Sequence, residues 1–204
     1  MHSPYGMGLV ENCLSCNLRS EGFFCRLPKA DMEAFQKIKF TLAYPAGATL
    51  FGEGQECRGI YILCRGRVKL ATTSNQGQTL ILKIVQPGEV LGLNTTVSGL
   101  PHEVTAETGQ PCQLNFVKRD DFIKFLTEHN EASMQAAIHL SRECQQAYQH
   151  LRSFVMHSAP QRIARLMLDW SNEDTGVATA TGIKVATLKL EMRAVDPLPG
   201  VRKH

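Results

Sequence analysis

Residues 59–92 read GIYILCRGRVKLATTSNQGQTLILKIVQPGEVLG, and this stretch decides the fold. Its runs 60–64 and 79–85 are rich in Ile, Leu, Val and Tyr, the residue types that favour strands. Glycine or proline separates the runs, as is typical of tight turns. The same texture extends from Leu42 to Val117 and leaves room for six or more strands. The sequence therefore predicts a β-sandwich or barrel.

Helical patterns flank this strand-rich region. From Asp31 onward, Met32, Phe35 and Ile38 recur every third residue and predict a short amphipathic helix. Between Asp120 and Gly176 there is no glycine, and apolar residues follow a three-four spacing at Ala137, Leu140, Cys144, Ala147, Leu151 and Phe154. This spacing is typical of a coiled-coil seam, so we expect a long helix that pairs with a second copy. A helix packed only within its own chain remains the alternative.

A further helix start is encoded at 158–161. Ser158 is a good N-cap residue, Pro160 is tolerated in the first turn, and Gln161 completes a capping box. The expected helix has its apolar face at Ile163, Leu166, Met167 and Trp170. Residues 171–182 then read as a polar loop that ends in glycine.

Composition places few restrictions on function. The chain has 204 residues, of which 43% are apolar and 20% charged, and no apolar run approaches the ~18 residues that cross a bilayer. We therefore expect a soluble, cytoplasmic protein with no membrane partner. The net charge of +3 comes from dispersed Lys and Arg residues and gives no indication of nucleic-acid binding. Seven cysteines in such a chain are expected to be reduced, metal-bound or redox-active.

The order of the turn motifs resembles the cyclic-nucleotide-binding fold and, with the helices that follow, the CRP/FNR family of transcription regulators. The resemblance runs from about Cys13 to Lys184 and is carried by Tyr44–Gly47, Leu50–Phe51, Glu53–Gln55, Gly59–Leu63, Gly66–Leu70, Gly77 and Pro87–Gly92. It implies an α+β chain with a jelly-roll barrel. Four parts are expected: a cysteine-containing segment at 1–30, the sensor barrel at 31–126, a dimerisation helix at 127–156, and a truncated helical remnant of a winged-helix domain at 157–204.

The family's nucleotide pocket has candidate counterparts at Gly88, Glu89, Gly92, His102 and Glu103. Nucleotide-binding members hold the cyclic phosphate with a Gly-Glu pair and an Arg, because a buried phosphate needs a bidentate cation. Here Leu93 follows Gly92, and the expected Arg is replaced near His102 and Glu103. A carboxylate would repel the phosphate, so the sequence disfavours a cyclic nucleotide as ligand.

Cys13, Cys16, Cys25 and Cys112 resemble the ligand set of the family's oxygen-sensing branch. In that branch three N-terminal cysteines and one barrel cysteine hold a [4Fe-4S] cluster, which needs four thiolates. The eight residues between Cys16 and Cys25 form a longer loop than that branch implies. Zinc binding, a thiol switch, or no cofactor remain alternatives. Three other cysteines are interpreted as small apolar residues: Cys57, Cys64 and Cys144.

The resemblance implies a regulator that senses a redox signal, oxygen or a small molecule and transmits it through the dimer helix to DNA. After Lys184 only 20 residues remain, and Pro197 and Pro199 interrupt them, so we expect no DNA-reading helix here. The expected partner is a second copy or a full-length relative. A ligand-binding or dimerisation module without DNA binding is the alternative. The barrel region holds only His102 as an imidazole ligand, so we expect no enzyme of the cupin type.

Overall fold

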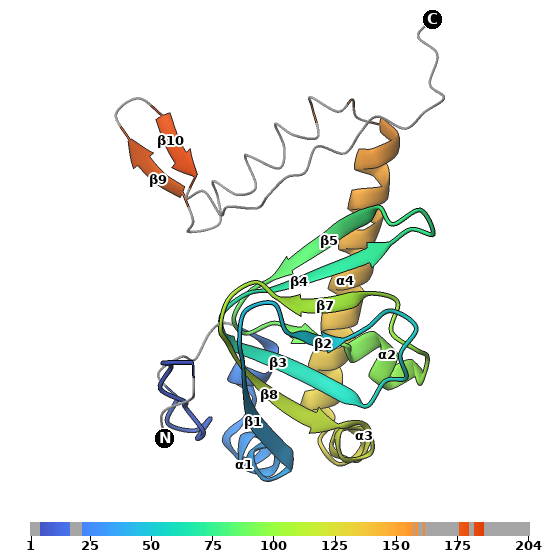
Figure 1. The fold of residues 1–204 in the computed structure, drawn as a ribbon. Coiled ribbons are helices and arrows are strands. Elements are labelled where there is room, and N and C mark those ends of the chain that lie inside the picture. Colours follow the sequence, from blue (N-terminus) through green and yellow to red (C-terminus); the bar gives the residue numbers. More distant parts are fainter. Residues whose placement is uncertain are drawn as a thin grey trace, which may run out of the picture. The chain divides into compact units, whose positions relative to one another are not determined.

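The computed structural model describes residues 5–16, 22–156, 158, 161, 176–179 and 182–185. The chain divides into two compact units, Met1–Cys144 and Gln145–His204. The first unit holds the barrel and its helices, and the second holds a short hairpin (Figure 1). No helix of the described ranges is long and apolar enough to cross a membrane.

Two four-stranded antiparallel sheets form the barrel (Figure 1). The first has the order β1-β8-β3-β6, from β1 (Lys39–Tyr44), β8 (Cys112–Lys118), β3 (Gly59–Arg65) and β6 (Val90–Leu91). The second has the order β2-β7-β4-β5, from β2 (Thr49–Phe51), β7 (Thr105–Thr108), β4 (Val68–Thr73) and β5 (Thr79–Val85). This jelly-roll-like arrangement confirms the barrel that the glycine-bounded strands predict.

The first sheet separates two apolar clusters. Because side chains alternate along a strand, Leu63 and Leu114 face the space between the sheets, whereas Ile62 and Val117 face the opposite side. The register pairs Leu63 with Leu114 and Ile62 with Asn115, so the two strands keep the same alternation. The first sheet thus has an inner face, which looks into the barrel, and an outer face, which is covered by helices.

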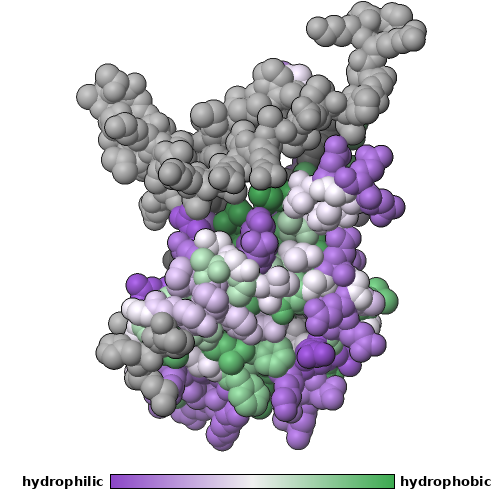
Figure 2. Space-filling model, in the orientation of Figure 1, coloured by the Kyte–Doolittle hydropathy of each residue, from purple (hydrophilic) through white to green (hydrophobic). Residues whose placement is uncertain are grey.

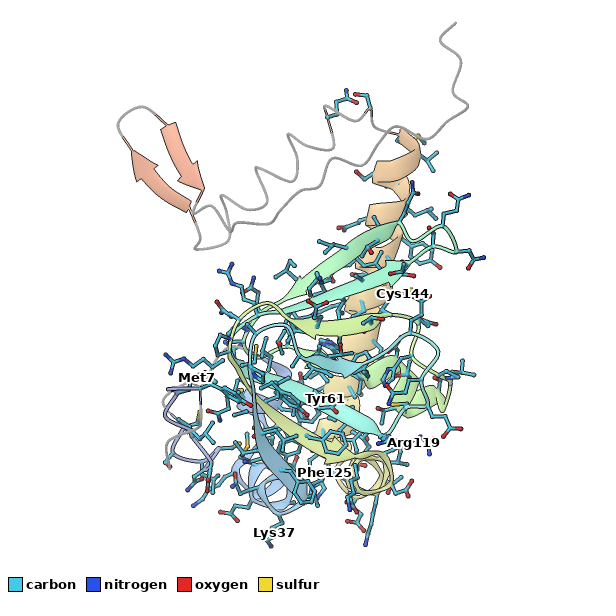
Figure 3. The ribbon with its side chains drawn as sticks, viewed as in Figure 1. Met7, Lys37, Tyr61, Arg119, Phe125 and Cys144 are labelled. Atoms are coloured by element: carbon cyan, nitrogen blue, oxygen red, sulfur yellow. The ribbon has the colours of Figure 1, made fainter. Side chains whose placement is uncertain are left out.

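The helices cover the outer face. They are the 3-10 helix η1 (Phe23–Arg26), α1 (Lys29–Ile38), α2 (Leu93–Ser98), α3 (Arg119–Glu128) and α4 (Asn130–Met156). The short helix expected from Asp31 is present as α1, with Met32 and Phe35 buried. Phe35 stacks on Phe24 at 4.9 Å and meets Phe125 of α3 edge-on at 5.7 Å. Figure 3 labels Phe125 of α3 and Tyr61 of β3.

Helix α4 begins at Asn130, after a break at His129. The sequence pattern did not predict this break. The break is tied to α1 because His129 Nδ1 lies 2.7 Å from Asp31 Oδ1. Ala132 and Ala136 are buried in the outer cluster, and Leu140 packs against it. The first turns of α4 are therefore part of the core of the first unit.

Beyond α4, the described residues form part of a helix start and a hairpin. Ser158 donates its backbone N–H to Gln161 Oε1 at 2.9 Å, as the capping box predicts. Strands β9 (Gly176–Thr179) and β10 (Gly182–Val185) pair antiparallel, so the loop expected at 171–182 was wrong for 176–179. The apolar residues of these two short runs favour strand pairing over a polar loop. The helix expected at 163–170 and the residues from 186 onward lie outside the described residues.

Candidate functional site

A cavity on the outer face gathers four cysteines. It has a volume of about 480 Å³, counting space open to solvent, and lies between the N-terminal segment, α1 and the strands β3 and β8. Its lining includes the thiol-bearing residues Cys13, Cys16, Cys25 and Cys64. The remaining lining is mostly apolar, with Asn115 as its polar side chain. None of the seven cysteines, all of which lie in the described residues, is part of a disulfide.

Two glutamine side chains hold the N-terminal segment in place. Gln113 on β8 accepts from the Val10 N–H at 3.0 Å and donates to the Val10 carbonyl at 2.7 Å. Gln36 on α1 accepts from the Cys13 N–H at 2.9 Å and donates to the Glu11 carbonyl at 2.9 Å. These amide clamps act as a substitute for strand pairing, since each satisfies backbone groups on the segment. They fix the position of Cys13 at the cavity.

Cys25 is placed by η1. Phe24 is 2% exposed and anchors the short helix in the outer cluster. On the other side Gly22 packs on Gly88, where a Cβ at position 22 would overlap the Gly88 carbonyl oxygen. Only glycine permits this close approach, which holds the turn before β6 against the loop that carries Cys25.

Burial and neighbouring groups change the pKa values of two cysteines in the cavity. Burial, and then the nearby Cys13, Cys25 and Cys16, raise the pKa of Cys64 to about 12. Burial also raises the pKa of Cys13, while the Lys39 ammonium and the Asn115 amide act in the opposite direction. Asn115 Nδ2 donates to Cys64 Sγ at 3.2 Å and to Cys13 Sγ at 3.6 Å. The cavity thus contains both thiols and groups that favour their anionic form.

Cys112, the fourth ligand that the resemblance implied, lies on the inner face. It is fully buried in the barrel cluster, and its thiol lies 3.1 Å from the Gln110 carbonyl and 3.3 Å from the Arg67 carbonyl. Its sulfur packs on Gly66, where a Cβ would overlap it. The structure therefore brings together Cys13, Cys16 and Cys25 but not Cys112, and it adds Cys64, which the sequence pattern had indicated to be a small apolar residue.

The other cysteines lie elsewhere. Cys57 Sγ is 3.1 Å from Thr96 Oγ1, and Cys144 is exposed on α4, as Figure 3 shows. Over the described part of the chain, no three His, Cys, Asp or Glu residues are grouped closely enough to hold a single metal ion. The signal for Cys64 was its two-residue spacing from Ile60 and Ile62 on β3, both of which lie in the outer cluster.

The five candidate nucleotide-pocket residues separate into two places. Gly88 lines the cysteine cavity, and Glu89 pairs with Lys83 at 2.7 Å and accepts from the Gln86 N–H. Gly92 instead precedes α2 with a φ of 75°, and Glu103 is exposed next to Asn94. His102 is close to Gly92 and is only 4% exposed.

His102 lies in the part of the chain where the resemblance to the cyclic-nucleotide-binding fold implied an arginine. Its ring stacks on Phe51 at 3.8 Å, and its Nδ1 lies 3.1 Å from Thr95 Oγ1. Burial lowers the pKa of His102 and favours the neutral imidazole. Leu93, at the position of the family's glutamate, is buried in the outer cluster. These contacts supply neither the cation nor the carboxylate of the nucleotide-binding pattern.

The predicted seam on α4 is largely exposed. Ala137, Cys144, Ala147 and Leu151 are exposed, Leu140 is half-buried, and the side chain of Phe154 lies outside the described residues. Exposed Leu151 retains 61% of its surface and Val155 retains 74%. Figure 2 shows hydrophilic and apolar residues interspersed over one face of the molecule.

Comparisons with known proteins match this architecture. The cyclic nucleotide-binding domain family matches residues 41–129. The CRP-like cAMP-activated global transcriptional regulator of Mycobacterium tuberculosis is 24% identical over 74% of this chain and 67% of its own length. The nitrogen fixation regulation protein FixK of Bradyrhizobium diazoefficiens is 25% identical over 78% of this chain and 65% of its own. The match thus spans about two thirds of these relatives.

Solved structures share the fold. The c-di-GMP responsive global regulator CLP of Xanthomonas campestris has a TM-score of 0.68 at 17% identity, over 76% of this chain and 78% of that one. FixK2 of Bradyrhizobium japonicum has a TM-score of 0.61 at 22% identity, over 70% of this chain and 69% of that one. The family match assigns residues 41–129 to the cyclic nucleotide-binding domain family. The chain that contains it is a relative of the CRP/FNR transcription regulators.

Proposed function

We propose that this chain is a transcription regulator of the CRP/FNR type that senses oxygen or redox state through an iron–sulfur cluster in the cysteine-lined cavity. The observation that carries the proposal is the gathering of four thiols around one cavity. Four thiolates are the usual protein ligands of a [4Fe-4S] cluster.

Packed side chains connect the cavity to the dimer helix. Cys13 packs against the same apolar cluster that contains Ala132 and Ala136 of α4. Loss of a cluster would release the N-terminal segment from this core and change the packing under the start of α4. Such a sensor would act by changing the position of α4.

The signal is not a cyclic nucleotide in this proposal. A buried phosphate requires a cation, and the neutral His102 packed on Phe51 lies in the part of the chain where the resemblance implied an arginine. The cAMP named for the Mycobacterium tuberculosis relative would find no fixed cation at these side chains.

Dimerisation occurs through α4. Its exposed three-four seam is self-complementary across a two-fold axis, so a second copy or a full-length relative is the expected partner. DNA is the ultimate target of the signal, either through residues 157–204 or through the DNA-reading part of a mixed-dimer partner. The dimer helix then acts as the transmitter.

Anaerobic purification of the full chain tests the sensing function. We expect a brown protein that contains iron and sulfide and loses its visible absorbance in air. A colourless chain that takes up no iron on anaerobic reconstitution would overturn the proposal.

An anisotropy titration with a two-fold symmetric family-type site and scrambled DNA tests the output. A preference above about a hundredfold, or 2.7 kcal/mol, indicates a DNA reader in this chain, and equal binding indicates a sensor and dimerisation module.

A further inference from the structure

We infer that Cys64 on β3 is the fourth thiolate ligand of the iron–sulfur site, together with Cys13, Cys16 and Cys25, and that Cys112 is a packing residue of the barrel. The inference rests on the proposed function and names the ligand set of that site. It differs from the set implied by the resemblance, in which Cys112 is the barrel ligand.

Cys64 lies on the outer side of the sheet, at the point where the β3–β8 register shifts between Leu63 and Arg65. It follows Ile62 by two residues on β3, and Ile62 belongs to the outer cluster. Asn115 lies opposite Ile62 in the β3–β8 register and therefore also faces outward. Cys64 shares the cavity with the three N-terminal cysteines because all four lie on this face.

Asn115 joins the strand cysteine to the N-terminal ones. One atom, its Nδ2, is 3.2 Å from Cys64 Sγ and 3.6 Å from Cys13 Sγ, so these two sulfurs are close neighbours. Lys39 reaches Asn115 Oδ1 at 3.3 Å and adds a positive charge beside the thiols. N–H donors and a cation next to sulfur stabilise the negative charge that four thiolates bring to a cluster.

Cys112 lacks access to the cavity. Its sulfur faces the barrel interior, packs on Gly66, and lies near two backbone carbonyls. Successive residues on β8 face opposite sides of the first sheet. The side chain of Cys112 would therefore have to pass through this sheet to reach the cavity. A thiol surrounded by Leu63 and Leu114 is instead a small apolar residue of the core.

Protons and bonds balance when a cluster assembles in the cavity. Each of the four thiols loses its proton to solvent as its sulfur bonds to one iron, and no disulfide has to break because none of these cysteines is part of one. Iron, in its ferrous and ferric forms, and sulfide are supplied by the reconstitution. The cavity contributes only thiolates, hydrogen bonds and exclusion of water.

Single serine variants of the full chain test the assignment. The variants are C64S, C112S and C57S, reconstituted anaerobically with iron and sulfide and compared with the unmutated chain by iron and sulfide content and visible absorbance. We expect C64S to lose at least tenfold in bound iron, and C112S and C57S to retain the content of the unmutated chain. Loss in C112S with full retention in C64S would overturn the inference while leaving the proposed function intact.

A second measurement guards against misfolding of a variant. In the unmutated chain, mass spectrometry after alkylation reports each cysteine separately, with Cys57, which contacts Thr96 outside the cavity, as an internal control. Cluster loading should slow the alkylation of Cys64 at least tenfold and leave Cys57 unchanged. Equal labelling of Cys64 with and without a bound cluster would contradict the assignment. Absence of iron in the unmutated chain would instead overturn both this inference and the proposed function.

Discussion

The side-chain amide of Asn115 on β8 lies 3.2 Å from the thiol sulfur of Cys64 on β3. The two residues meet because the strand register places Asn115 opposite Ile62, one step from Cys64 on the same face. Asn115 is 3% exposed, and its carbonyl oxygen accepts from Thr41 Oγ1 at 3.0 Å. The amide is therefore held with its N–H groups directed at the sulfur atoms.

Replacing this amide should change the redox potential of a bound cluster. Asn115→Leu removes the N–H donors to two sulfurs, and such donors stabilise the more negative, reduced form. We expect the potential to fall by some tens of millivolts, on the order of one hydrogen bond of ~1 kcal/mol. Potentiometric titration measures it, with the exposed Asn94→Leu as the matched control. An unchanged potential at full iron content would show that the amide does not act on the cluster.

The Gln113 clamp should control access to the site. Gln113→Ala removes both bonds to the Val10 backbone and should free residues 8–14, at a cost of about 1–3 kcal/mol for two hydrogen bonds. Hydrogen exchange should then be faster at the Val10 amide, and bound iron should be lost sooner in air. The exposed Gln110→Ala serves as the control. Equal exchange at Val10 in both variants would mean that other contacts hold the segment.

The contact between Gly66 and Cys112 should make position 66 intolerant of any side chain. Gly66 has a φ of 103°, and an added Cβ would overlap the Cys112 sulfur. We expect Gly66→Ala to lower the free energy of unfolding by about 2–5 kcal/mol. Gly77→Ala, with a φ of 80° and open space around it, should cost only about 1–2 kcal/mol. Urea unfolding compares the two, and equal losses would argue against the tight packing of Cys112.

His102 should make the barrel less stable in mild acid. Burial between Phe51 and α2 lowers its pKa below the ordinary value of 6.5, so the unfolded chain binds a proton more readily than the folded one. The stabilising contribution is complete above pH 6.5 and is lost as the pH falls toward the lower folded pKa. Near His102, Thr95 is neutral, Cys57 lies beyond Thr95, and Glu103 is exposed.

Thermal unfolding between about pH 7.5 and 5 measures this dependence. In His102→Gln the decline below pH 6.5 should be smaller than in the unmutated chain, because the titrating group is gone. His157→Gln, at a histidine that follows the barrel in the sequence, controls for the loss of an imidazole. Parallel pH profiles for His102→Gln and the unmutated chain would exclude His102 as the source of acid sensitivity.

The exposed seam of α4 should hold the dimer together. Leu151 is 61% exposed, so Leu151→Glu leaves the core of the first unit intact but places a charge in the seam. We expect the dimer dissociation constant to rise at least tenfold, or about 1.4 kcal/mol. Leu140 is a poorer test because it also packs on its own domain. Light scattering measures the mass, with Gln149→Glu away from the seam as control. A monomeric unmutated chain at micromolar concentration would exclude the dimer.

The sequence by itself determined the barrel and the helix that follows it. Glycine-bounded runs of β-branched and aromatic residues specify strands and turns locally, and the spacing of Met32, Phe35 and Ile38 specifies α1. The family resemblance grouped Cys13, Cys16 and Cys25 with Cys112, and only the first three of these are close together in the chain. Such features depend on nearest neighbours, so they can be read before any folding is known.

Only the tertiary structure decided which cysteine completes the group. Cys64 and Cys112 both lie on strands next to one another, and their sequence positions do not reveal which face of the sheet is covered by helices. That depends on the packing of α1, α3 and α4, and on the amide clamps from Gln36 and Gln113 to a segment far away in sequence. Moving a residue by one position along a strand turns its side chain to the other face of the sheet. One position therefore separates a thiol that lines the cavity from a thiol in the core.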